Sequence, residues 1–91
     1  MDEILIEDIG MVMITVLFFG AVAERVGQRQ LTVDHHPGML LQDLHDALQA
    51  EHPEAFAIVS LAAVDGEHVR DWSTPVDDRS EVVFMSKFSG G

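Results

Sequence analysis

The sequence contains no cysteine and has few basic residues. Without cysteine the chain can form no disulfide, no cysteine-ligated metal site and no thiol nucleophile of its own. Asp and Glu outnumber Lys and Arg by 16 to 5, which gives a formal net charge of −11. Such a surface repels phosphate backbones and anionic lipids, so nucleic acids and membranes are poor partners. A protein with a basic face fits better, although acidity also simply keeps small proteins soluble.

Long hydrophobic runs are also missing. The apolar stretch at 11–19 is much shorter than the roughly 20 residues that span a bilayer, and no basic residue precedes it. We therefore expect neither a membrane span nor a signal peptide, and a cytoplasmic location. The chain also lacks a GxxxxGK[ST] phosphate-binding loop. With 91 residues, 47% of them hydrophobic, it corresponds to one domain with enough apolar material for a core.

The first half of the sequence predicts two strands joined by a helical turn. Residues 1–12 mix acids with aliphatic residues and are interpreted as an extension, which we expect to be poorly ordered. The β-branched and aromatic run 13–19 predicts a largely buried strand, and the alternation at 30–34 predicts a half-exposed one. Between them, 21–26 predicts a short helix stopped by Gly27.

The middle of the sequence predicts one amphipathic helix of roughly three turns. Leu41, Leu44 and Leu48 recur at helical spacing, and Pro53 marks the end of the pattern. His45 and Asp46 fall on the polar face, where we expect them to be solvated.

The second half predicts a short helix and three more strands. A helix is expected at 54–59, and strands at 61–64, 67–72 and 81–86. Asp65-Gly66 is a strong hairpin signal between the first two of these strands. Trp72 is expected to anchor the 67–72 strand to the core, and the polar stretch 73–80 reads as a loop.

This order of elements predicts an α+β fold, a β-grasp (ubiquitin-like) roll. Two hairpin-like pairs flank one main helix packed across a mixed sheet, with the apolar first and last strands at its centre. We assign this domain to residues 13–86. Residues 87–91 (KFSGG) then form a flexible tail that projects beyond the sheet.

The tail ends in Gly90-Gly91, which adds nothing to a core because glycine loses the most entropy on ordering. A chain end without side chains can instead pass through a narrow channel of another protein, leaving its carboxylate accessible. A carboxylate reacts only after activation, most simply as an acyl-adenylate. Sulfide or persulfide would convert that species into a thiocarboxylate. In this interpretation the chain is a carrier, and its partners supply the nucleotide site and the positioning.

Three segments resemble the small subunit of molybdopterin synthase: MITVLFFGAVAERVG at 13–27, the leucine helix, and EVVFMSKFSGG at 81–91. The resemblance implies a non-catalytic β-grasp sulfur carrier whose Gly91 is adenylated and thiocarboxylated. It implies that the tail then enters the large synthase subunit and gives sulfur to precursor Z, building the molybdopterin dithiolene. The implied partners are that large subunit in a heterotetramer, an ATP-using activating enzyme, and a sulfurtransferase or persulfide donor.

The tail departs from the family pattern, which leaves alternatives open. Many members have a Pro-Pro pair where this chain has Ser86-Lys87, and valine where it has Phe88. The chain could therefore carry sulfur for another pathway, such as thiamine or cysteine synthesis. The related thiamine-pathway carrier is usually shorter and lacks the 21–27 helix, so we rank it lower. A ubiquitin-like protein modifier is the third interpretation.

Several side chains are candidates for a role beyond packing. Phe18 and Phe19 should point to opposite faces of the strand, and Phe19 with Met85 is a candidate partner interface. The tail residues Lys87, Phe88, Ser89 and Gly90 would accompany Gly91 into a partner's site. We expect no metal and no bound cofactor, and His35 and His36 to be ordinary loop residues. Asp77, Asp78 and Glu81 are expected near the root of the tail, as a docking patch or as a solvated loop.

Overall fold

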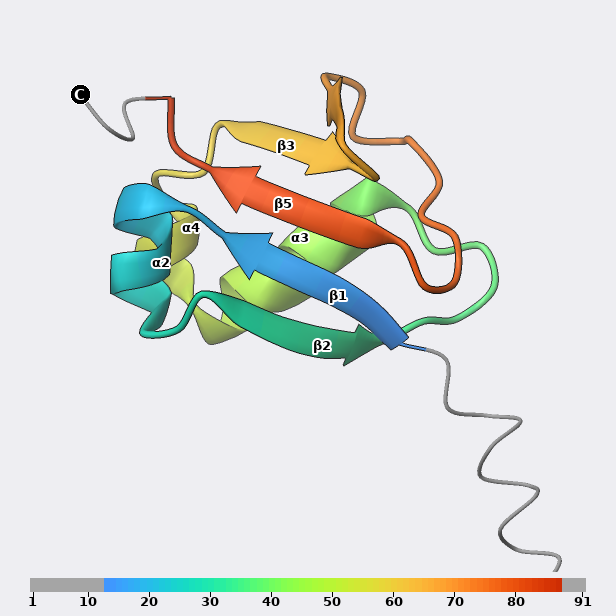
Figure 1. Ribbon diagram of the computed structural model, residues 1–91. Helices are drawn as coiled ribbons and strands as arrows, with labels where there is room; N and C mark the ends of the chain where they lie inside the picture. The colour runs from blue at the N-terminus through green and yellow to red at the C-terminus, as the bar shows by residue number, and fades with distance from the viewer. Residues whose placement is uncertain (1–12, 88–91) are drawn as a thin grey trace, which may run out of the picture.

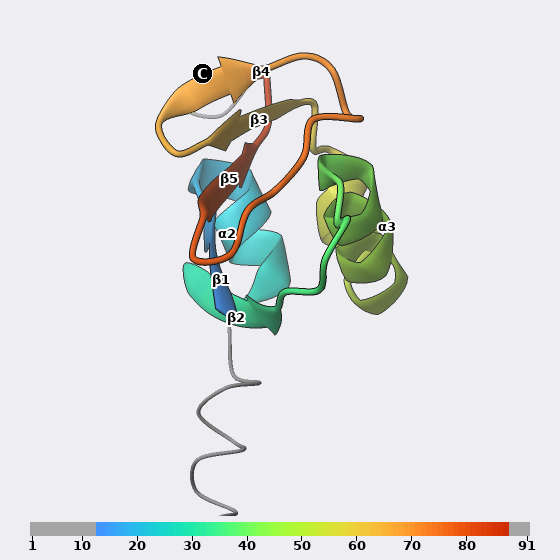
Figure 2. The same ribbon diagram turned by 90° about the vertical axis from the view of Figure 1, so that its right-hand side faces the viewer.

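The computed structural model describes residues 13–87, so the extension at 1–12 and the tail residues 88–91 lie outside the described part. The described chain forms two layers, a five-stranded sheet and a set of helices that all lie on one side of it (Figures 1 and 2). This is the predicted β-grasp roll.

The sheet has the order β2-β1-β5-β3-β4. Its strands are β1 (Met13–Phe18), β2 (Gln30–Asp34), β3 (Leu61–Val64), β4 (Glu67–Val69) and β5 (Glu81–Met85). The first and last strands, β1 and β5, are parallel neighbours at the centre, and every other pair is antiparallel. The prediction that the two apolar strands occupy the centre is confirmed.

The main helix, α3 (Leu41–Glu51), lies across the sheet and closes the core (Figure 2). Its leucine stripe Leu41, Leu44 and Leu48 is buried, as the spacing predicts. Alternate residues of β1 point at the same core, because successive side chains of a strand face opposite sides. The helix begins with a side-chain cap, in which the Asp43 carboxylate accepts a hydrogen bond from the backbone N–H of Leu40 at 2.9 Å.

Two short helices sit beside α3 at one end of the sheet (Figure 1). The first, α2 (Gly20–Val26), ends at Gly27, whose φ of +93° is left-handed and favours glycine, so the predicted stop is confirmed. The second, α4 (Pro53–Phe56), ends earlier than the predicted helix at 54–59. Pro53 occupies its first turn, where the missing N–H costs nothing.

The prediction of a strand at 67–72 is wrong in length, because β4 ends at Val69. Trp72 still packs on the core, but from the turn that follows the strand. Its ring stacks on Phe84, with centroids 6.2 Å apart and planes at 6°. Asp71 shapes that turn by accepting hydrogen bonds from the N–H and hydroxyl of Ser73 at 2.9 and 2.6 Å.

The expectation that His45 is a solvated side chain is also wrong. Only 17% of the side chain is exposed, because the ring packs edge-on against Trp72 and Phe56, with centroids 5.0 and 5.4 Å away. The neighbouring Asp46 is exposed, as expected. The helical spacing placed His45 beside the leucine stripe but could not show that aromatic rings reach over it.

The acidic residues expected near the tail lie elsewhere. Glu81 opens β5, and Asp77 and Asp78 precede it, whereas the tail leaves the other end of this strand (Figure 1). The start of β5 is held by Asp65, whose carboxylate accepts a hydrogen bond from the Glu81 N–H at 2.9 Å. An acidic docking patch at the tail root is therefore excluded for these residues.

Candidate functional site

The tail leaves the fold at the end of the central strand β5. A loop of the fold holds its root in place at two points: the Lys87 N–H donates to the Ser60 hydroxyl at 2.7 Å, and the Ser60 N–H donates to the Met85 carbonyl at 3.1 Å. Ser86, between them, is buried. The direction of the chain at Lys87 is therefore fixed by β5 and by the loop that precedes β3.

Three apolar side chains surround this exit: Phe19, Leu61 and Met85, here called the docking patch. Phe19 is 50% exposed and Leu61 36% exposed, the largest exposures among the big hydrophobic residues described. Leu61 pairs with Met85 across neighbouring strands, so the two side chains share a face of the sheet. Apolar groups left uncovered around one point are typical of a protein–protein contact.

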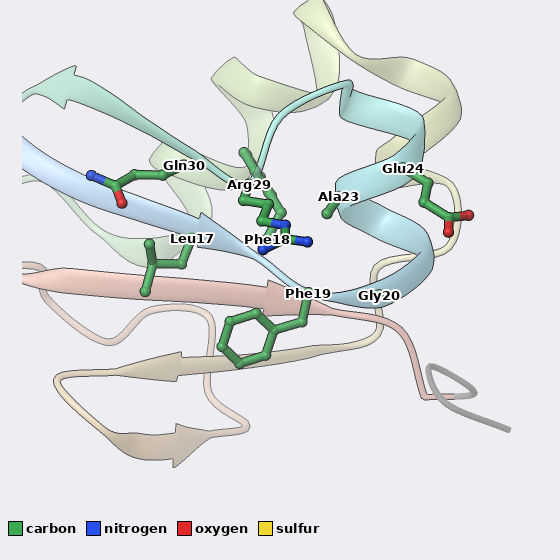
Figure 3. A pocket seen from close by; sticks show the side chains of 8 residues that line it. All are labelled: Leu17, Phe18, Phe19, Gly20, Ala23, Glu24, Arg29 and Gln30. Carbon is green, nitrogen blue, oxygen red and sulfur yellow. The ribbon is translucent and has the colours of Figure 1, made fainter.

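Phe19 belongs to this patch because the chain turns sharply after it. Phe19 keeps an extended backbone as the residue before α2, and its N–H donates to the Phe84 carbonyl at 3.4 Å. Gly20, with a φ of +57°, then starts the helix. Figure 3 shows the Phe19 ring pointing away from α2, while Phe18 points inward. The predicted opposite orientation of the two phenylalanines is confirmed.

A hollow of about 530 Å³ lies between the end of β1, α2 and the start of β2 (Figure 3). Phe19 lies at its edge, and Arg29 and Glu24 contribute charge on its other sides. Arg29 makes no side-chain hydrogen bond or ion pair with residues 13–87, so its guanidinium is available to an outside group. The hollow extends the docking patch with a place where a polar group of a partner can be held.

The site carries little chemistry of its own. Lys87 is exposed, as expected, and is the only lysine of the chain. Within residues 13–87, no cluster of His, Asp or Glu could hold a metal ion, and no helix is long and apolar enough to cross a membrane. The His35 ring connects two loops that are distant in the sequence, with Nε2 2.8 Å from the Val76 carbonyl oxygen.

The structure brings the interface candidates Phe19 and Met85 to the exit of the tail, and adds Leu61 and Ser60, which the sequence reasoning missed. Leu61 could have been found from its place at the start of a strand whose later residues are small and buried. The reactive end proposed from the sequence, Gly91, and the tail residues Phe88, Ser89 and Gly90 lie outside the described residues. Their roles remain predictions.

The fold matches solved structures of small ubiquitin-like proteins. The small archaeal modifier protein 1 of Haloferax volcanii has a TM-score of 0.73 at 22% identity, covering 87% of this chain and 99% of its own. A putative molybdopterin converting factor subunit 1 of Pyrococcus furiosus has a TM-score of 0.73 at 19% identity, and the match covers 82% of this chain and 97% of that one. A chain from the Helicobacter pylori complex of molybdopterin-converting factor subunits 1 and 2 has a TM-score of 0.65 at 21% identity, and the match covers 87% of this chain and 99% of that one.

These likenesses define the class: a small β-grasp protein of the ubiquitin-like type. Within it, the model of the ThiS family matches residues 16–91, so the chain belongs to the ThiS family of small sulfur carriers. No curated protein matches the sequence.

Proposed function

We propose that this chain is the sulfur carrier of molybdenum-cofactor synthesis, the small non-catalytic subunit of a molybdopterin synthase. The observation that carries the proposal is the position of the tail. It leaves the central strand beside the docking patch and ends in Gly90-Gly91. A partner that binds the patch would therefore meet the root of the tail, at Lys87, in a fixed direction. Membership of the ThiS family and the likeness to subunit 1 of molybdopterin-converting factors support this assignment.

The proposed chemistry takes place at the Gly91 carboxylate, in the active sites of partners. A carboxylate oxygen attacks the α-phosphorus of ATP and expels pyrophosphate, which gives the acyl-adenylate. Sulfide then attacks the carbonyl carbon and expels AMP, leaving a thiocarboxylate. A persulfide donor would first give an acyl disulfide, which a thiol reduces to the same product. The thiocarboxylate sulfur then bonds to a carbon of precursor Z and displaces an oxygen substituent from that carbon. Water hydrolyses the resulting thioester, which releases the Gly91 carboxylate and leaves the sulfur on the product, and a second such transfer completes the dithiolene.

Each step needs precise placement of the chain end rather than a catalytic side chain in this protein. The bond between the Lys87 N–H and the Ser60 hydroxyl serves that need, because it fixes the backbone of the chain as far as Lys87. The net charge of −11 favours partners with basic faces, and the docking patch gives them an apolar anchor. ATP is consumed by the activating enzyme and is not bound by this chain.

The test is intact mass spectrometry of the purified chain after incubation with its activating enzyme, ATP and a sulfur source. The expected result is a mass gain equal to the oxygen-to-sulfur difference, located on the C-terminal peptide. A variant with one extra residue after Gly91 should fold normally, as judged by circular dichroism, and show no gain. A mass gain that survives this extension would rule out the terminal carboxylate as the reactive group.

The likeness to small archaeal modifier protein 1 favours a second candidate, a carrier that also modifies proteins. An amine would then attack the acyl-adenylate, expelling AMP and forming an amide. Reconstitution with precursor Z and the large subunit separates the candidates from a carrier for another pathway. Dithiolene formation supports our proposal, whereas stable conjugates on target lysines without dithiolene formation support the modifier.

A further inference from the structure

The two edges of the sheet differ in how well they are protected. At one edge, β4 has only three residues and follows directly on a tight turn at Asp65-Gly66. At the other edge, β2 has five residues and contains no proline or lysine, and its only charged residue is Asp34 at its end. Natural sheets usually protect an edge with such residues, with a bulge, or with a covering segment. Nothing within residues 13–87 covers the outer side of β2.

The register shows which backbone groups of β2 are available. The Phe18 N–H donates to the Arg29 carbonyl at 2.9 Å, so every second residue after Arg29 also bonds to β1. The N–H and C=O groups of Gln30, Thr32 and Asp34 therefore point away from the sheet. No backbone hydrogen bond from elsewhere in residues 13–87 reaches them. These outward N–H and C=O groups could form the backbone hydrogen bonds of one more strand.

A groove runs along this edge, between β2 and α3. It has a volume of about 230 Å³. Its apolar lining residues are Leu31, Val33, Ala47 and Leu48, and its polar ones are Thr32 and Glu51. Leu31 and Val33 are half-buried, so their outer sides remain accessible. A strand added beside β2 could place alternate side chains in this groove, since side chains of a strand alternate between its faces.

The charge around the groove selects its occupant. Glu51 lines the groove, Asp34 ends the strand, and both are exposed. The chain's own N-terminal segment carries Asp2, Glu3, Glu7 and Asp8, and a second copy of the chain carries the same net charge of −11. Like charges disfavour both of these occupants, whereas basic residues beside an apolar core would be attracted.

We infer that the outer edge of β2 and the β2–α3 groove form a strand-addition site for an extended apolar segment with basic flanks, supplied by another protein. The added segment would form backbone hydrogen bonds with Gln30 and Thr32 and place alternate apolar side chains in the groove. The carboxylates of Asp34 and Glu51 would attract its basic flanking residues. This site lies on an edge strand, away from the exit of the tail at β5. It would let the carrier be held by one protein while its tail is presented to another.

The test is a titration of the isotope-labelled full chain, followed by NMR. The probe is a short synthetic peptide of alternating valine and threonine with two lysines at each end. The amide chemical shifts of Gln30, Thr32, Ala47 and Leu48 are expected to change, whereas those of the docking patch should stay the same. The same peptide with glutamate flanks should bind more weakly by a factor of at least roughly ten, because the Asp34 and Glu51 carboxylates repel it.

Two variants sharpen the test. Thr32→Pro removes an outward N–H at a position where an edge strand tolerates proline, so the fold should survive and peptide binding should fall roughly tenfold or more. Thr32→Val keeps that N–H and is the matched control. Glu51→Lys should narrow the difference in affinity between the two peptides, because only the Asp34 carboxylate then remains to favour lysine flanks.

Four results would overturn the inference. The first two are unchanged β2 amide signals at saturating peptide, and equal affinity for the peptides with lysine and glutamate flanks. The other two are contacts between residues 1–12 and Thr32 in the peptide-free chain, and a dimer joined through β2. Thiocarboxylation of Gly91, measured separately by mass, should be unchanged in Thr32→Pro. Failure of this site is thus distinguishable from failure of the proposed carrier function.

Discussion

Phe18 and Phe19 are neighbours in the sequence and differ completely in their surroundings. Phe18 is 1% exposed and meets the Phe56 ring edge-on, with centroids 6.1 Å apart. Phe19 is 50% exposed and lies beside the exit of the tail. The alternation of a strand, followed by the turn at Gly20, thus buries one ring in the core and leaves the other half-exposed on the surface.

The same division holds for the two faces of the sheet. The face toward α3 carries buried side chains from both central strands, among them Val16, Val82 and Phe84. Within residues 13–87, no helix lies on the opposite face (Figure 2). Leu61 and Met85, which pair across β3 and β5, are on this face. One layer of helices covers only one face of a sheet, so apolar residues on the other face stay accessible to solvent within the described part of the chain.

Truncation on the closed face should have the largest effect. Phe18→Ala removes a fully buried ring and leaves a cavity, which should lower the free energy of unfolding by about 3–5 kcal/mol. Urea unfolding followed by Trp72 fluorescence measures this loss. Phe18→Leu, which keeps much of the volume, should cost clearly less. A loss under about 1 kcal/mol for Phe18→Ala would mean that the two faces do not differ as described.

Truncation on the open face should leave the fold intact and weaken binding. Phe19→Ala should change the free energy of unfolding by less than about 0.5 kcal/mol, as is usual for exposed positions. It should weaken the complex with the large synthase subunit by about 2 kcal/mol, the scale of an aromatic anchor. Calorimetric titration of the two purified proteins measures the affinity. Unchanged affinity would remove Phe19 from the interface.

Much of the fold could be predicted from local patterns. The leucine spacing predicted α3, the alternation at 30–34 predicted β2, and Asp65-Gly66 predicted the β3–β4 turn. These signals are local because helix and strand periods and turn residues act over a few positions. Where an element ended through tertiary contacts, as β4 does before Trp72, the pattern gave the wrong boundary.

The site could be predicted only in part, because its members meet through the topology. The sequence singled out Phe19 and Met85 as interface candidates, and the tail chemistry stays a prediction. Leu61 and Ser60 join this region only because β3 pairs antiparallel with β5. The acidic residues were misplaced for the same reason. Glu81 and Lys87 are close in sequence, but Glu81 is at the start of β5 and Lys87 lies beyond its end. His45 was misjudged because Trp72 reaches it from a distant turn.

A hydrogen bond at the border of the open face gives a smaller test of the comparison. Ser60→Ala removes the acceptor of the Lys87 N–H and should cost about 0.5–1.5 kcal/mol locally. Hydrogen exchange at the Lys87 amide should accelerate, while global unfolding changes little. Ser60→Thr keeps the hydroxyl and serves as the control. If exchange is unchanged in Ser60→Ala, this bond does not hold the root of the tail.

The outer surface of α3 should show the smallest effect, a difference in stability that disappears in acid. The Gln42 side-chain amide donates to the Asp46 carboxylate at 2.8 Å, and this bond, with a lesser one from His45, lowers the pKa of Asp46 below its ordinary value of 3.8. A carboxyl whose pKa is lower in the folded state stabilises the fold above the ordinary value, and that contribution disappears as the pH falls through the lowered pKa.

Asp46→Asn should therefore be slightly less stable than the parent chain at neutral pH and should approach it below about pH 4. Urea unfolding across this pH range, again read from Trp72, measures the convergence. Asp78→Asn is the matched control, because Asp78 is exposed and accepts no hydrogen bond from residues 13–87. Because Asp46 lies on the solvent side of the helix layer, Phe19→Ala should not alter the convergence. An altered convergence would mean that the two faces are coupled, contrary to the separation that Phe18 and Phe19 indicate.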